Sequence, residues 1–255
     1  MSLHVESHGA GAPLLLIHGW GMHGGIWGGM VERLAQHCRV VCVDLPGHGA
    51  SVPLDDEFNL DQLVQALSVQ FDEPLTVCGW SLGGQLALRW AALHPQQVNK
   101  MILLASTPCF VQRTDWPHAM AAETLQEFAN ALLANHAQTL KRFLALQVRG
   151  SENERELLAD LRSRLFSRGE PDLAALRGGL EILRDTDLRA SLAQLQQPAL
   201  VIAGARDMLT PLAASQYMAQ VLPDARLASV AGAAHAPFLS HPEMVVERMV
   251  DFLHE

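Results

Sequence analysis

The chain lacks long apolar runs and is poor in positive charge. None of its apolar stretches approaches the about 18 residues that a membrane-spanning helix needs. Its 18 Lys and Arg residues stand against 27 Asp and Glu residues, which gives a formal net charge of −9. Proteins that bind nucleic acid carry a basic footprint instead. We therefore expect neither a membrane span nor a nucleic-acid partner.

Cysteine is scarce, and the N-terminal residues lack the pattern of a secretory signal. The 4 cysteines form no C-x-x-C pair, and three of them lie in or beside expected buried strands. This arrangement favours small buried hydrophobes in a reducing compartment over disulfides. Residues 1–6 do not lead from a charged segment into an apolar one, as a signal peptide would. We expect a cytoplasmic protein.

Motifs for metals and nucleotides are also missing. His94, His118 and His136 show no ligand-like spacing with acids or cysteines. The glycines between positions 19 and 25 do not form G-x-G-x-x-G with a following acidic partner, as a dinucleotide site requires. We expect no metal and no cofactor.

Short apolar segments alternate with helical patterns along most of the chain. Continuous apolar runs of this length indicate strands that are buried on both faces of a parallel sheet. The alternation therefore predicts an α/β protein with a mostly parallel, doubly wound sheet. The expected strands are 5–11, 14–17, 39–43, 75–78, 100–105, 198–203 and 225–230, and the expected helices between them are 27–35, 60–71, 85–93, 212–222 and 242–253.

One region interrupts this alternation. Between about positions 115 and 185 no convincing strand is present. Helical patterns occupy 119–134, 138–148, 152–166 and 171–183. We predict a core formed by 1–110 and 186–255, with a helical lid at 111–185. The lid is expected after the sixth strand, over the carboxyl ends of the strands.

The segment Gly79-Trp80-Ser81-Leu82-Gly83 lies between an expected strand and an expected helix. Strand, G-x-S-x-G and helix together are typical of a nucleophile elbow, which lifts a serine hydroxyl clear of the sheet. Glycines at both ends remove Cβ atoms that would block such a tight turn. Ser81 is therefore the candidate nucleophile, although an ordinary strand-to-helix turn has the same pattern.

A serine hydroxyl needs a base within hydrogen-bond reach, and the base needs an acid that orients it. His235 and Asp207 each follow an expected strand, and ligand sites of doubly wound sheets lie at such strand ends. The order Ser81, Asp207, His235 is that of the α/β-hydrolase triad. Asp44 is the rival acid because it also ends a strand, but it precedes the serine and suits a structural turn.

The oxyanion that forms during ester cleavage must be met by backbone N–H groups. The residue after the nucleophile, Leu82, supplies one candidate donor, and Trp20 supplies the other from the loop after strand 14–17. We expect His18 to brace this loop and Trp80 to pack near the pocket without a chemical role.

The lid has an excess of three positive charges in an otherwise acidic protein. A solvated helix face with mixed charges explains this excess, and so does a docking face for an acidic partner. The apolar residues of segment 143–147 are either helix core or the roof of a pocket. The basic residues are Lys141, Arg142, Arg149, Arg155, Arg162, Arg164 and Arg168, and the acidic ones are Glu152, Glu154, Glu156 and Asp160.

Taken together, these motifs resemble the pimeloyl-[acyl-carrier protein] methyl ester esterases, which are carboxylesterases of the α/β-hydrolase fold. The resemblance covers nearly the whole chain, and its lid segments are the more specific part. The motifs are His18-Gly19-Trp20-Gly21, Asp44-Leu45-Pro46-Gly47, Gly79-Trp80-Ser81-Leu82-Gly83-Gly84, Ser106-Thr107-Pro108-Cys109-Phe110, Arg142-Phe143-Leu144-Ala145-Leu146-Gln147, Gly178-Gly179-Leu180-Glu181-Ile182-Leu183 and His235-Ala236-Pro237-Phe238.

The resemblance implies hydrolysis of the methyl ester of a pimeloyl chain that is attached to acyl carrier protein, a step of biotin synthesis. It also implies a pocket lined by Trp20, Ser81, Leu82, Phe143, Leu144, Ala145, Leu146, Gln147 and His235. Lid arginines of this family contact the carrier protein. Arg142 and Arg155 fall on those positions, but Gln138 and Ala159 replace two other arginines, for which Arg149 and Arg162 are candidate substitutes. We expect a monomer that acts on a carrier-bound substrate.

Two other functions remain open. One is a carboxylesterase or other serine α/β-hydrolase with broad activity on short chains, which would use the same triad. The other is a ligand receptor on the same fold, which would turn over simple esters slowly or once. Multiple turnover of p-nitrophenyl acetate that is lost in Ser81→Ala separates an enzyme from a receptor.

Overall fold

The computed structural model describes residues 3–54 and 58–255 of the chain. Within this part, seven strands form one sheet in the order β1-β3-β2-β4-β5-β6-β7. β1 pairs with β3 in antiparallel orientation, and the other neighbours are parallel. The predicted doubly wound sheet is confirmed. The strands are β1 (Val5–His8), β2 (Pro13–Ile17), β3 (Arg39–Val43), β4 (Leu75–Trp80), β5 (Val98–Leu104), β6 (Ala199–Gly204) and β7 (Ala225–Val230).

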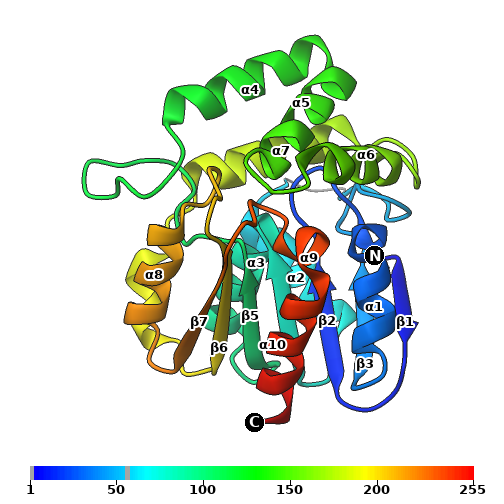
Figure 1. Cartoon of the computed structure of the whole chain (residues 1–255), viewed down its shortest axis with the longest axis vertical. Coiled ribbons are helices and arrows are strands. Elements are labelled where there is room, and N and C mark those ends of the chain that lie inside the picture. The colour runs from blue at the N-terminus through cyan, green and yellow to red at the C-terminus, as the bar shows by residue number, and fades with distance from the viewer. Residues whose placement is uncertain (1–2, 55–57) are drawn as a thin grey trace.

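Helices cover both faces of this sheet (Figure 1). α2 (Leu60–Gln70), α3 (Leu82–Leu93) and α8 (Leu212–Val221) lie on one face, and α1 (Gly29–Leu34) and α10 (Pro242–His254) lie on the other. Because both faces are covered, every residue of the central strands β4 and β6 is buried. The short segments η1 (Gly24–Trp27), η2 (Arg189–Gln194) and α9 (Pro237–Ser240) complete the core.

Four helices form the lid over the carboxyl ends of the strands (Figure 1). They are α4 (Ala122–Ala134), α5 (His136–Val148), α6 (Glu154–Leu165) and α7 (Leu173–Asp185). Side-chain caps fix two of their starts: Asn135 accepts a hydrogen bond from Gln138 N at the start of α5, and Asp172 accepts from Ala174 N at the start of α7.

The predicted position of the lid after the sixth strand is wrong. In the described residues the lid follows β5, the fifth strand of the chain, and precedes β6. The strands expected from the sequence also number five before position 111, so the count of six does not follow from them. The first strand of the structure, β1, pairs along its whole length with β3.

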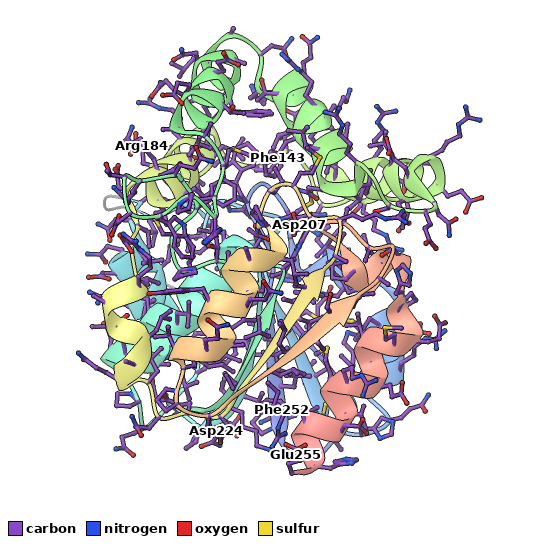
Figure 2. All side chains as sticks on the ribbon, turned by 60° about the vertical axis from the view of Figure 1, so that its left-hand side comes forward. Phe143, Arg184, Asp207, Asp224, Phe252 and Glu255 are labelled. Carbon is purple, nitrogen blue, oxygen red and sulfur yellow. The ribbon has the colours of Figure 1, made fainter. Side chains whose placement is uncertain are left out.

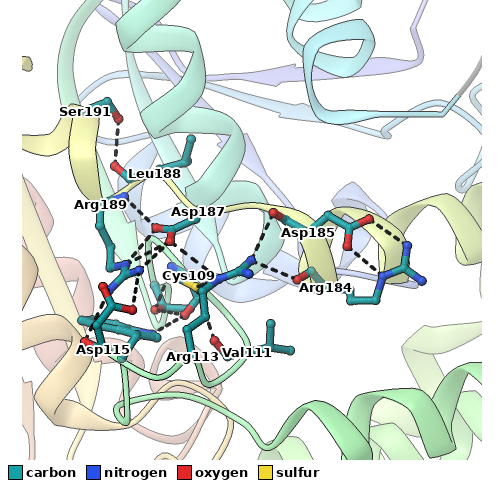
Figure 3. A network of polar contacts seen from close by, with 12 residues as sticks. Cys109, Val111, Arg113, Asp115, Arg184, Asp185, Asp187, Leu188, Arg189 and Ser191 are labelled. Carbon is teal, nitrogen blue, oxygen red and sulfur yellow. Dashed lines mark hydrogen bonds and ion pairs between the residues drawn. The ribbon is translucent and has the colours of Figure 1, made fainter.

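The two chain segments that join lid and core lie side by side (Figure 3). Cys109 and Asp187 form an antiparallel bridge. The Arg189 guanidinium pairs with Asp187 at 2.7 Å and with Asp115 at 3.0 Å. It also lies 5.4 Å from the ring centre of Trp116. A planar guanidinium that pairs and stacks at once holds its neighbours in fixed orientation, so this network fixes the base of the lid.

Candidate active site

Ser81 occupies a strained turn between β4 and α3. Its φ and ψ are 56° and −115°, a conformation that side chains rarely adopt. A Cβ atom at Gly79 would lie 2.1 Å from the Gly83 carbonyl oxygen, and one at Gly83 would lie 2.3 Å from the Ile17 oxygen. Only glycine fits at either position. The strained serine between two such glycines has the backbone geometry of a nucleophile elbow.

The end of β5 holds this turn in place. Ser81 N donates to the Leu104 carbonyl at 3.0 Å. The Ser106 hydroxyl donates to the Ser81 carbonyl at 2.7 Å. Ala105, between these two partners, also has a positive φ of 43°. The serine is therefore fixed on both sides by neighbouring backbone, as a preorganised site requires.

Asp207 and His235 lie together, and both side chains are completely buried. His235 Nδ1 is 2.8 Å from Asp207 Oδ2, which also accepts from the Thr210 hydroxyl at 2.7 Å. The other carboxylate oxygen, Oδ1, accepts from Leu209 N at 2.8 Å and from Thr210 N at 3.0 Å. An acceptor-only carboxylate requires a proton on Nδ1. The imidazole is thereby held in the tautomer whose Nε2 carries a lone pair.

The His235 imidazole has an open acceptor that faces away from Asp207. Its Nε2 is buried and has no hydrogen-bond partner among the described residues. The elbow lies beside this loop, because Trp80 Nε1 donates to the His235 carbonyl at 2.8 Å. His48 Nε2 is also buried without a partner in this part of the chain, but of the two rings only His235 combines an open Nε2 with a carboxylate at Nδ1. The arrangement suits a general base next to a serine.

The lid also touches the loop that carries His235. His235 N donates to the Gln147 carbonyl at 3.0 Å, at the end of α5. Ala234 N donates to the Ser151 hydroxyl at 3.3 Å, and Glu152 N donates to the Gly232 carbonyl at 3.3 Å. These contacts could not be predicted, because main-chain bonds between distant segments leave no motif in the sequence.

The loop after β2 packs against the elbow and is braced by His18. His18 Nδ1 donates to the Gly19 carbonyl at 2.8 Å, and its Nε2 accepts from Leu45 N at 2.9 Å. Complete burial, together with the neighbouring His48, lowers the pKa of His18 to about 3, so the ring is neutral. A Cβ atom on Gly19 would lie 3.3 Å from the Ser81 Cβ. This loop therefore reaches the serine.

Two backbone amides are available beside the serine. Leu82 is the first residue of α3, and an amide at this position has no acceptor inside its own helix. Trp20 follows Gly19 in the loop that touches Ser81, and its indole Nε1 donates to the Leu176 carbonyl of the lid at 2.8 Å. The helix dipole adds positive potential at the start of α3. This end of the site suits a developing negative charge.

Phe143 of α5 lies in the lid, above Asp207 of the core (Figure 2). Phe143 packs edge-on against Trp20, with ring centres 4.9 Å apart. Phe143, Leu144 and Gln147 are buried, whereas Ala145 and Leu146 are half-buried. Ser81 is only 6% exposed beneath them. The Ser81 side chain is therefore largely shielded from solvent.

Asp44, the rival acid, connects the core to the lid. It accepts from Gly24 N at 2.6 Å and from Ala50 N at 2.9 Å, and Arg168 of the lid lies 3.2 Å from both carboxylate oxygens. Burial raises the pKa of Asp44, but these hydrogen bonds and the positive charges nearby outweigh it, and the net shift is downward. Within the described residues, Asp44 makes no hydrogen bond or ion pair with His235.

The basic residues of the lid fall into two groups. Arg164 pairs with Asp160 at 2.8 Å, and Arg168 pairs with Asp44 and Glu6. The second group is exposed and has no carboxylate partner within the described part of the chain. Five exposed cations on α5, on α6 and directly after α5 therefore have no ion-pair partner in the described residues. This set is Lys141, Arg142, Arg149, Arg155 and Arg162.

No group of three or more His, Cys, Asp or Glu side chains is placed to hold a metal ion in residues 3–54 and 58–255. Over the same residues, no helix combines the length and apolar character needed to cross a membrane.

Comparison with known proteins identifies the family. A sequence family described as alpha/beta hydrolase fold matches residues 12–242. The chain is 48% identical over 247 residues to the pimeloyl-[acyl-carrier protein] methyl ester esterase of Nitrosomonas europaea, covering 96% of this chain and 97% of that protein. This chain belongs to the pimeloyl-[acyl-carrier protein] methyl ester esterase family of α/β-hydrolases. The family resemblance inferred from the motifs is thus confirmed.

Two further relatives agree with this placement. The esterase of the same name from Chromobacterium violaceum is 43% identical over 253 residues, covering 99% of this chain and 98% of that protein. The solved structure of an esterase from Exiguobacterium antarcticum superposes with a TM-score of 0.90 at 23% identity, covering 99% of this chain and 96% of that one. The second likeness supports the fold alone.

Proposed function

We propose that this chain is a serine carboxylesterase that hydrolyses the methyl ester of a pimeloyl chain carried by acyl carrier protein, a step of biotin synthesis. The observation that carries the proposal is the 2.8 Å contact between His235 Nδ1 and Asp207 Oδ2. It leaves His235 Nε2 without a partner, in the loop next to the strained Ser81 elbow.

In the first half of the reaction, Ser81 Oγ attacks the ester carbonyl while His235 Nε2 takes its proton. Asp207 orients the ring and stabilises the imidazolium. The N–H groups of Trp20 and Leu82 receive the oxyanion, and collapse of the intermediate expels methanol with the proton from His235. In the second half, His235 activates a water molecule that cleaves the acyl-enzyme and releases the free carboxylate.

The free cations of the lid support a carrier-bound substrate. Arg142 lies on the exposed face of the helix whose buried face carries Phe143 and Leu144, so a cationic surface and an apolar roof share one element. Arg162 lies seven residues after Arg155 on α6, which is about two helical turns. Arg149 directly follows the last residue of α5. Because both are exposed cations near Arg142 and Arg155 in sequence, we propose that they compensate for Gln138 and Ala159.

The relatives' names support the substrate, since they specify an acyl-carrier protein as carrier and a methyl ester as the bond that is cut. The four cysteines are free and buried, as in proteins of a reducing compartment, which supports a cytoplasmic location. We propose that the enzyme acts as a monomer.

The first experiment tests the chemistry. The wild-type protein should turn over p-nitrophenyl acetate many times and release methanol from pimeloyl-carrier methyl ester. Ser81→Ala should lose both activities, because the remaining groups cannot form an acyl-enzyme. A single turnover by the wild type, or unchanged activity in Ser81→Ala, contradicts a serine esterase and favours a ligand receptor.

The second experiment tests carrier docking. The double variant Arg142→Glu/Arg155→Glu should raise KM for the carrier-linked ester and leave the kinetics of p-nitrophenyl acetate nearly unchanged. Arg177→Glu is a matched control, because this exposed arginine lies on α7 and has no partner in the described residues. Equal effects on both substrates contradict docking and favour an esterase of broad specificity.

A further inference from the structure

The main chain at His235 is held from two opposite sides. Its N–H donates to the Gln147 carbonyl at the end of lid helix α5, at 3.0 Å. Its carbonyl accepts from the indole Nε1 of Trp80, the residue just before the nucleophile, at 2.8 Å. All three residues are buried. The peptide groups that set the direction of the imidazole are therefore fixed by two groups outside the triad.

We propose that Trp80 is a positioning residue that aligns the His235 imidazole with Ser81, and that closure of the lid completes this alignment through Gln147. The inference rests on the proposed triad and adds a role for the second residue of the Gly79–Gly83 turn. It assigns to the lid a part in the chemical step as well as in substrate binding.

The indole is itself rigidly placed, as a positioning group must be. Its ring packs edge-on against Phe238, with centres 5.0 Å apart, and lies 6.5 Å from the ring of Trp27. The centre of the His235 ring lies 5.8 Å from that of Trp80. Because Trp80 precedes Ser81 directly, a shift of the elbow moves the hydrogen-bond donor and the nucleophile together. The serine and its base thus stay in register.

The lid supplies the complementary restraint through more than one bond. Ser151 Oγ accepts from Ala234 N, and Glu152 N donates to the Gly232 carbonyl, so residues 147–152 follow the His235 loop over several peptide groups. Movement of residues 147–152 away from the core would break these bonds. His235 then loses one of its two main-chain restraints while the site is open and regains it on closure.

The principal test replaces the N–H donor and retains the aromatic packing. Trp80→Phe should lower kcat for p-nitrophenyl acetate by about 10- to 100-fold, the cost of misplacing a reacting group by about 1 Å. KM should change little, because the indole does not touch substrate in this proposal. A matched control is Trp90→Phe. Trp90 is equally buried on α3 and its Nε1 donates to Gln97 Oε1 at 2.9 Å, away from the triad.

Two measurements separate positioning from general damage. β-(3-Benzothienyl)alanine at position 80 exchanges only the indole N–H for sulfur, and it should reproduce the fall in kcat while the melting temperature stays near that of the wild type. The downfield proton NMR signal of His235 Nδ1–H should broaden or shift in both Trp80 variants and remain in the Trp90 control. These results distinguish a misaligned imidazole from a loosened core.

The lid half of the proposal has its own variant. Ser151→Ala removes the acceptor for Ala234 N and should lower kcat less than Trp80→Phe does, because the Gln147 carbonyl still holds His235. The proposal is overturned if the benzothienyl variant keeps wild-type kcat, or if Trp90→Phe loses as much activity as Trp80→Phe. Failure of the proposed function looks different: the wild type itself would then show no turnover that depends on Ser81.

Discussion

Replacement of Asp207 by asparagine is the sharpest test of how the acid acts on the base. The structure predicts which way the new amide points. Oδ1 accepts two backbone N–H groups, from Leu209 and Thr210, so the amide oxygen must take that side. The amide N–H₂ then faces His235 Nδ1 at the position of the present 2.8 Å contact.

An amide donor at this position reverses the tautomer of the imidazole. Nδ1 becomes the acceptor and Nε2 keeps its proton, so it cannot take one from Ser81. An asparagine in this role lowers kcat by about 10⁴-fold in a serine–histidine–aspartate triad, which corresponds to about 5.4 kcal/mol of transition-state stabilisation. The fold should survive, because the two backbone bonds to Oδ1 remain and the Thr210 hydroxyl can rotate to accept.

The assay compares Asp207→Asn with Asp44→Asn, the rival acid. Asp44→Asn leaves Arg168 without its buried partner and should cost about 3 kcal/mol of unfolding free energy, with kcat per folded molecule close to that of the wild type. Active-site titration with a fluorophosphonate counts the competent molecules, and urea unfolding measures stability. Near-normal turnover in Asp207→Asn, together with a large loss of kcat in Asp44→Asn, would refute the reasoning.

Two further predictions concern buried groups near the site. Burial lowers the pKa of His48 to about 4 and of His18 to about 3, below the unfolded value of about 6.5. Stability is therefore fully present above that value and is lost as the pH falls toward the folded pKa values, by up to about 1.4 kcal/mol per pH unit for each histidine. His48→Gln should reduce the slope seen in urea unfolding between about pH 6 and about pH 5, and an unchanged slope contradicts this account. Gly179→Ala would place a Cβ atom 2.5 Å from Trp20 Cδ1, so it should lower kcat for p-nitrophenyl acetate and cost about 1–3 kcal/mol of unfolding free energy. Gly29→Ala, with nothing within 4 Å of the new atom, is the control, and equal losses in both variants would contradict the packing argument.

Local patterns of apolar and polar residues predicted most strands and helices of the core, because these patterns depend on which sides of each element are buried. The run Leu14–Ile17 is apolar at every position because helices cover both faces of its sheet, and no alternation is needed. The expected helix at 27–35 begins later, at Gly29. Its first residue, Trp27, instead ends η1, and Gly28 between the two segments has a φ of 50°. The sequence did not indicate whether Gly28 or Gly29 would interrupt the expected helix.

The turn at Ser81 and the proximity of Asp207 to His235 could be predicted because each residue follows the end of its own strand. The triad itself stays a prediction. The partners that restrain these residues could not be predicted, since they depend on the side on which distant segments meet. Trp80 was expected only to pack, yet its indole reaches a carbonyl 155 residues away in sequence. The pairing of Arg168 with Asp44 was likewise hidden in a count of lid charges, where every arginine is equivalent.

The geometry of α5 limits how binding and chemistry can be separated in this protein. Successive residues of a helix point to different sides, so Arg142 faces solvent while Phe143 and Leu144 face the site, and the helix ends at the carbonyl that receives His235 N–H. Under the proposed function, a carrier that docks on the outer face contacts the same element whose Gln147 carbonyl receives His235 N–H. A substitution inside α5 acts on substrate binding, on lid position and on the base together. Its distance from Ser81 alone does not predict which kinetic constant will change, and comparison of a carrier-linked ester with a free ester is needed to assign the effect.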